Sequence, residues 1–147
     1  MDRLEFFQKQ CGPVEMRIRE LCMEDEYVKL LMTVPGIYYY LASLIASYIG
    51  DPHRFPDFDH LASFLGIIPM TRESGKIRRV GRMTKDGPSR AKWALSIAVN
   101  TVMERSGVIH DYCIRVKGRT GSGKMAHVLT MKKLAGMMYH MMLTGQK

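Results

Sequence analysis

Residues 30–37 decide how the rest of the chain is interpreted; they read LLMTVPGI and precede a run of apolar and small residues. Pro35 disfavours helix at the residue before it, and Gly36 readily takes the backbone angles of a tight turn. The segment therefore predicts two short helices, at residues 26–33 and 37–49, joined by a sharp turn. Such a pair, with a P-G-I turn between its members, is typical of a helix-hairpin-helix.

This motif can hold one backbone phosphate between its turn amides and the positive end of its second helix. Its second glycine normally leaves room for the phosphate, but here that position is Tyr38, within the run YYY. A side chain there weakens phosphate binding at the turn. Two interpretations of residues 27–50 stay open: a purely structural hairpin, or a nucleic-acid contact at Gly36, Ile37 and Tyr38 in which tyrosines stack or hydrogen-bond instead.

Apolar residues recur at helical spacing through most of the remaining chain. The further helices are predicted at residues 3–24, 57–65, 88–105 and 125–143, with a short segment at 107–116. Gly12 and Pro13 are expected to kink or break the first of them. The strand signal is weak everywhere, so the expected fold class is mostly α, a compact multi-helix domain.

Charge is divided unevenly along the 147 residues, whose formal net charge is +8. Residues 1–71 hold 6 basic and 10 acidic side chains, whereas residues 72–147 hold 16 basic and 4 acidic ones. A charge of this sign predicts nucleic acid as a partner, or less often an anionic membrane. The longest apolar run, residues 37–49, falls short of the roughly 20 residues that span a bilayer, so no membrane partner is expected.

The densest positive charge follows residue 71, in a segment at 67–87 that is expected to be irregular or hairpin-like. Its glycines suit an exposed loop, and flexible cations beside glycines suit contact with phosphates. A solvated basic loop without a partner is the alternative. The candidate nucleic-acid-binding residues are Arg72, Lys76, Arg78, Arg79, Arg82, Lys85, Arg90 and Lys92.

Ser74 lies inside this basic segment and is the candidate catalytic residue. A serine hydroxyl that attacks a phosphodiester builds negative charge on the phosphoryl oxygens, and surrounding Arg and Lys side chains would stabilise that charge. A phosphoserine linkage would also keep the energy of the broken strand, so that rejoining needs no ATP. The alternative is an ordinary loop serine.

The other motifs in the sequence are weaker indications of function. Residues 118–124 have the spacing G-x-x-x-x-G-K, but Met125 replaces the Ser or Thr that a nucleotide-binding loop needs for magnesium, which favours a basic nucleic-acid contact loop. His110 and Cys113 have no second pair to complete a zinc site. The three cysteines are odd in number and far apart, so a reducing cytoplasm is the simplest compartment. No set of carboxylates fit for a metal is visible, and no cofactor is expected on this chain.

In order, the chain contains P-G-I at 35–37, I-G-D at 49–51, R-F at 54–55, L-A-S-F-L-G-I at 61–67, S-G at 74–75 and G-R-M-T-K-D-G at 81–87. Together with Pro69, these residues resemble the C-terminal domain of the IS116/IS110/IS902 family of insertion-sequence transposases. The resemblance begins near Tyr27 and runs to the end of the chain. It implies a C-terminal transposase domain at residues 26–147, with a helix-hairpin-helix, a serine-bearing basic loop at 67–87 and a helical remainder at 88–144.

The resemblance implies a DNA recombinase that is guided by a structured RNA, with Ser74 as nucleophile. The family joins this domain, through a coiled-coil helix, to a RuvC-like domain whose four acids bind Mg²⁺; residues 1–25 resemble the end of that connector. Two departures are Tyr38 and the missing RuvC-like acids, so this chain alone is expected to bind nucleic acid without recombining it. Further expectations are a RuvC-like domain acting in cis or in trans, a homo-oligomer, and a prokaryotic cytoplasm, at the nucleoid when bound. The alternative is a non-enzymatic DNA- or RNA-binding module or a relic of a truncated transposase.

Overall fold

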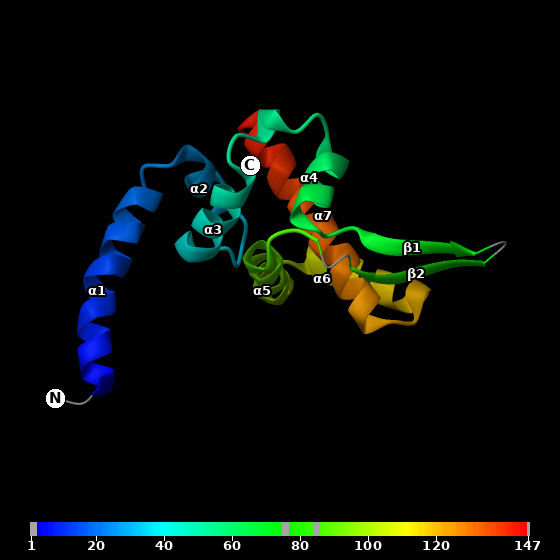
Figure 1. Ribbon diagram of the computed structural model, residues 1–147, viewed down its shortest axis with the longest axis horizontal. Helices are drawn as coiled ribbons and strands as arrows, with labels where there is room; N and C mark the ends of the chain where they lie inside the picture. Colours follow the sequence, from blue (N-terminus) through cyan, green and yellow to red (C-terminus); the bar gives the residue numbers. More distant parts are fainter. Residues whose placement is uncertain (1–2, 75–76, 84–85, 147) are drawn as a thin grey trace.

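A computed structural model describes residues 3–74, 77–83 and 86–146 of the chain (Figure 1). The predicted mostly α fold class is confirmed. In chain order the elements are α1 (Arg3–Cys22), α2 (Glu26–Leu31), α3 (Tyr39–Ile49), the short 3₁₀ helix η1 (Pro52–Arg54), α4 (Phe58–Leu65), β1 (Pro69–Ser74), β2 (Ile77–Met83), α5 (Ser89–Arg105), α6 (Gly107–Thr120) and α7 (Gly123–Thr144).

The core forms around α7, which packs against α2, α4, α5 and α6. Leu134 and Met138 of α7 are fully buried, as are Leu95 and Val99 of α5. Burying such side chains contributes about 1.5–3 kcal/mol each, so this helix pair supplies much of the stability. None of the helices in the described part of the chain is both long and apolar enough to cross a membrane.

Helix α1 differs from the sequence expectation because it runs without a break through Pro13. It extends away from the other helices (Figure 1), and Cys22 at its last position is its only buried residue among those described. The polar side of the helix faces water as expected. Its apolar side does so as well, since Leu4, Phe7, Val14, Ile18 and Leu21 are all exposed.

Two aspartates begin the elements after α3. Asp51 caps η1 by accepting a hydrogen bond from the backbone amide of His53. Asp57 caps α4 in the same way, by accepting one from the backbone amide of His60. The same carboxylates also bond the imidazole rings, at 3.0 Å and 2.8 Å. These hydrogen bonds stabilise the charged carboxylates, and therefore hold the pKa of each aspartate below its ordinary value.

The segment at 67–87, for which an irregular or a hairpin-like form was expected, is a hairpin. β1 and β2 pair in antiparallel fashion, with an irregularity in register between Pro69 and Thr71. This two-stranded β-ribbon, formed by β1 and β2 and called the ribbon below, projects from the helices on the side away from α1 (Figure 1). Weak strand propensity was misleading here because a two-stranded pair closed by local backbone hydrogen bonds needs little apolar patterning.

Candidate nucleic-acid interface

The hairpin carries the predicted catalytic serine and half of the predicted cationic contacts. Arg72 pairs with Arg79 across the two strands, and Ser74 pairs with Ile77. Because strand residues alternate between faces with a period of two, Ser74 shares one face of the ribbon with Arg72 and Arg79. Arg78 pairs with Glu73 on the other face. The register therefore gathers a serine and two arginines at neighbouring positions.

Of the three remaining predicted contacts in this segment, one lies among the residues that the structure describes. Arg82 lies on β2, one residue before its end at Met83. Lys76 and Lys85 lie outside the described residues. Ser74 is the last residue of β1, and the strand ends meet at the tip of the ribbon far from the helices (Figure 1). The backbone at Ser74 thus lies at the end of the ribbon that is farther from the helices.

Two glycines fix the base of this hairpin. Gly66 and Gly87 both have positive φ angles, of 67° and 85°, and their backbones lie against each other. A Cβ on Gly87 would lie 2.7 Å from the amide nitrogen of Gly66, and a Cβ on Gly66 would overlap the carbonyl oxygen of Asp86. Close backbone contact of this kind requires residues without side chains. The contact holds the residues just before β1 against the residues just before α5.

Arg90 and Lys92 lie just beyond this base, in the first turn of α5; Arg90 is exposed and Lys92 is half-buried. The ammonium group of Lys92 donates a hydrogen bond to the Asp86 carbonyl oxygen at 2.8 Å, so Lys92 also braces the base of the hairpin. Pro88 precedes the helix and offers no side-chain cap. The positive end of α5 therefore adds to the charge of Arg90 at this point.

The turn between α2 and α3 divides the three residues predicted to contact nucleic acid there. Gly36 and Ile37 are buried, and the Ile37 amide donates to the Val34 carbonyl at 3.0 Å. Gly36 has a φ of 93°, and a Cβ there would lie 2.5 Å from the carbonyl oxygen of Thr101 in α5. Packing against α5 thus explains this glycine. Tyr38 is 55% exposed, with the guanidinium of Arg105 5.9 Å from its ring centre.

Residues 118–124, expected as a basic loop, are mostly helical. α6 continues to Thr120, Gly121 ends it in the left-handed region, and Ser122 caps α7 by accepting from the Met125 amide at 3.3 Å. This is a tight connection between two helices. No strand leads into it, as a nucleotide-binding loop would require.

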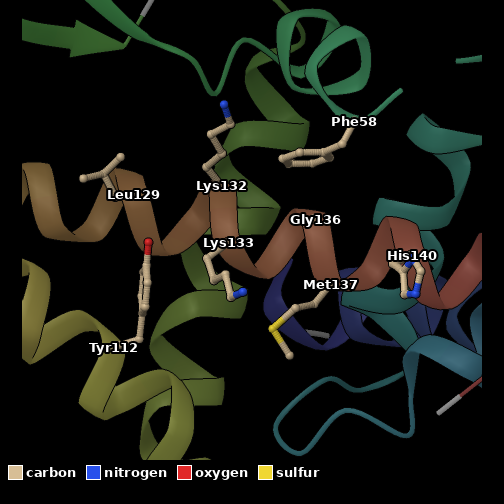
Figure 2. Close-up of a pocket in the computed structure, with 8 residues that line it drawn as sticks. All are labelled: Phe58, Tyr112, Leu129, Lys132, Lys133, Gly136, Met137 and His140. Carbon is tan, nitrogen blue, oxygen red and sulfur yellow. The ribbon is translucent and has the colours of Figure 1, made fainter. Parts of the chain in front are cut away.

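A groove of about 500 Å³ runs along the outer face of α7. Figure 2 shows Phe58 of α4 and Tyr112 of α6 on opposite sides of it, with Lys132 and Lys133 between them. Lys132 pairs with Asp59 at 3.0 Å, which neutralises one of the two cations. The full set of described lining residues is Phe58, Tyr112, Leu129, Lys132, Lys133, Gly136, Met137 and His140. These residues provide apolar contact and positive charge, but neither a carboxylate nor a hydroxyl nucleophile apart from the tyrosine.

Sequence reasoning missed a half-buried serine–histidine pair in the helical body. Ser96 of α5 and the Nε2 atom of His127 of α7 lie 2.9 Å apart. Burial lowers the pKa of His127, because it penalises the charged imidazolium. The described residues show no acid bonded to the other ring nitrogen, so the pair lacks the third member of a hydrolytic triad. We interpret it as a polar link between two packed helices.

Beside Arg90 lies a notch that is lined by Tyr40, a member of the tyrosine run weighed for stacking, and by Trp93, which sequence reasoning missed. The signal was present for Trp93, since it falls outside the buried stripe that includes Ala91, Ala94 and Leu95. Metal chemistry has no comparable support: among the residues that the structure describes, no three His, Cys, Asp or Glu side chains gather. Cys113 itself is buried in the packing of α6.

Comparison with known proteins adds three relatives. The uncharacterized 44.8 kDa protein of insertion element IS116 from Streptomyces clavuligerus is 28% identical over 106 residues, covering 71% of this chain and 26% of the relative. A probable family 20 transposase from Pseudomonas aeruginosa is 28% identical over 86 residues, covering 58% and 25%. The uncharacterized 43.6 kDa protein of insertion element IS110 from Streptomyces coelicolor is 23% identical over 137 residues, covering 93% and 34%.

This chain thus spans about a quarter to a third of the length of these curated relatives. A family model matches residues 28–113, from α2 through the hairpin and α5 into α6. The match covers more than half of the chain and includes both glycines at the base of the hairpin. On this evidence the chain belongs to the Transposase IS116/IS110/IS902 family.

Proposed function

We propose that this chain is the serine-bearing part of a transposase, which binds DNA along the β1–β2 ribbon and uses Ser74 as nucleophile. The observation that carries the proposal is the strand register, in which Ser74 shares a face of the ribbon with Arg72 and Arg79. Family membership supports a role in transposition. The projection of the ribbon from the helices gives a duplex room to approach it (Figure 1).

The chemistry would proceed by two exchanges of phosphoryl esters. The serine oxygen forms a bond to phosphorus, the bond from phosphorus to one sugar oxygen breaks, and that oxygen leaves with a proton. A sugar hydroxyl of another strand then attacks the same phosphorus and releases the serine. Positive charge close to the phosphoryl oxygens lowers both barriers, because negative charge develops there in each transition state.

The metal that such a reaction uses does not fit this chain, because its described acids and histidines do not gather into a site. We therefore assign Mg²⁺ to a RuvC-like domain, supplied in cis or in trans. The site would be composite: this chain brings the nucleophile and cations, and that domain brings the metal ligands. A structured guide RNA would bind through the same cationic surface.

A trapping experiment tests the role of Ser74. The chain is incubated with a RuvC-like partner domain, Mg²⁺ and a nicked suicide DNA substrate, and covalent protein–DNA adducts are separated by denaturing electrophoresis. We expect an adduct with the wild type and none with Ser74→Ala. Ser63→Ala, which changes an exposed serine on α4, is the matched control and retains the adduct.

DNA binding by the same variants separates the two possible functions. If Ser74→Ala binds DNA normally and also forms the adduct, another residue is the nucleophile. If the wild type binds DNA but never forms an adduct with the partner domain present, the chain is a non-enzymatic binding module.

Arg79→Gln should weaken binding and reduce the slope of log K against log salt by about 0.9, the loss of one phosphate contact. Arg17→Gln on α1 should leave the slope unchanged.

A further inference from the structure

A notch of about 250 Å³ lies between the first halves of α3 and α5. Tyr40 and Leu44 of α3 line it together with Arg90 and Trp93 of α5. Tyr40 is 51% exposed and Trp93 is 50% exposed. The notch therefore presents two aromatic side chains to solvent, beside a guanidinium, in a chain that contains one tryptophan in all.

This combination of side chains is chemically specific. Aromatic rings offer flat faces on which a planar group can stack, and a neighbouring arginine offers a fork of donors for a phosphate. The described lining includes no carboxylate. The second half of the chain, to which Arg90 and Trp93 belong, carries 16 basic against 4 acidic residues. A ligand that is both planar and anionic matches the notch in shape and in charge.

We propose that the notch binds one unpaired nucleotide of a DNA or RNA strand. Its base stacks against Trp93 and Tyr40, and its phosphate contacts Arg90. The bases inside a duplex are stacked on one another, so only an unpaired or extruded nucleotide can place its ring there. Because α5 begins shortly after β2 ends, the notch lies near the base of the ribbon. This inference rests on the proposed nucleic-acid binding and adds a preference for unpaired strands.

Trp93 is the sole tryptophan, so tryptophan emission, excited at a wavelength that tyrosine does not absorb, reports on the notch. The full chain is titrated with single-stranded DNA, single-stranded RNA and blunt duplexes of the same sequence, while labelled oligonucleotides report binding by anisotropy. We expect single strands to quench Trp93 emission and duplexes to leave it nearly unchanged. Stronger quenching by RNA would identify an RNA strand as the occupant, and stronger quenching by DNA would identify a DNA strand.

Tyr40→Leu removes one stacking face while keeping apolar bulk, and we expect it to weaken single-strand binding about fivefold or more. Phe6→Leu is the matched control, because Phe6 is equally exposed but lies on α1. Trp93→Leu should weaken binding, whereas Trp93→Phe should largely restore it. Circular dichroism checks that each variant is folded, and the fluorescence titration of the wild type does not depend on any variant.

Failure of the notch and failure of the proposed function give different results. If oligonucleotides bind by anisotropy but Trp93 emission does not change and Tyr40→Leu binds single strands like Phe6→Leu, the notch is not a nucleotide site, while nucleic-acid binding stands. If neither single strands nor duplexes bind at low salt, both proposals are overturned.

Discussion

At the scale of single residues, Arg54, which belongs to the sequence pattern shared with the transposase family, has a structural role. Arg54 donates to the carbonyl oxygens of Ile49 and Tyr48 at 3.0 Å and 2.9 Å, which satisfies the end of α3. Its guanidinium also lies 4.5 Å from the ring centre of Phe55 and 5.0 Å from that of Phe64. A cation at a helix C-terminus is favourable, and only arginine can combine this role with stacking on two rings. Arg54 thus holds α3, η1 and α4 together.

His127 gives a pH-dependent prediction at this scale. Its pKa is lowered in the folded protein by burial, whereas in the unfolded chain it takes the ordinary value of about 6.5. As the pH falls through that value the unfolded chain binds the proton first, so the free energy of unfolding decreases until the pH is below the folded pKa. We expect His127→Gln to lose this part of the pH dependence, measured by urea unfolding between about pH 7.5 and pH 5.

Ser96→Ala is the control, because it removes the hydrogen bond but keeps the titrating imidazole. It should be less stable at every pH and should retain the decline. An unchanged decline in His127→Gln would show that other groups cause it. Asp51 and Asp57 act in a separate window: their lowered pKa values contribute stability that is lost only as the pH falls below about 4.

At the scale of elements, the junction of the hairpin with the helices depends on Gly66 and Gly87. We expect Gly66→Ala to destabilise the protein by more than the roughly 1–3 kcal/mol that a left-handed non-glycine residue costs, because the new methyl group would also overlap the Asp86 carbonyl oxygen. Chemical unfolding followed by circular dichroism measures the loss.

Gly121→Ala is a matched control for this prediction. Gly121 has the same φ of 67°, but nothing lies within 4 Å of the position that its Cβ would occupy. The difference between the two variants therefore isolates the backbone contact from the conformational cost. Equal losses would mean that the base of the hairpin relaxes without penalty and that the glycine pair does not fix the ribbon.

At the scale of the whole molecule, α1 leaves a long apolar stripe unpaired. Its positions follow the alternating spacing of three and four residues that defines a coiled-coil seam. They are Leu4, Phe7, Cys11, Val14, Ile18 and Leu21, and all are exposed. Gly12 and Pro13 fall on the opposite side, which lets the proline remain in a helix that pairs through the stripe.

We expect the chain to self-associate through this stripe at micromolar concentration. Val14→Glu should convert the assembly to monomer, because it places a charge in the seam, whereas Met16→Glu introduces the same charge on the outward side and should leave the assembly intact. Sedimentation velocity measures the masses. A monomeric wild type would contradict the expectation, and so would dissociation by both variants alike.

How much the sequence could predict varies with the element. The helices at 57–65 and 88–105 were predicted almost to the residue, since apolar spacing and flanking glycine or proline mark them locally. The hairpin was only one of two forms expected for residues 67–87, because strand pairing depends on a partner that local propensity does not reveal. The packing of Gly36 against Thr101 and the meeting of Tyr40 with Trp93 were out of reach, because each joins residues far apart in the chain.

The sequence by itself determined the helical class, the separation of charge between the two halves and the serine among cations, since each of these depends on residue type and short-range spacing. Only the tertiary structure decided that Gly36 packs against Thr101, that Gly66 and Gly87 clamp the ribbon, and that Tyr40 and Trp93 share a notch. These features join residues far apart in the chain, and contacts of that kind are selected by the packing of the whole core rather than by local preference.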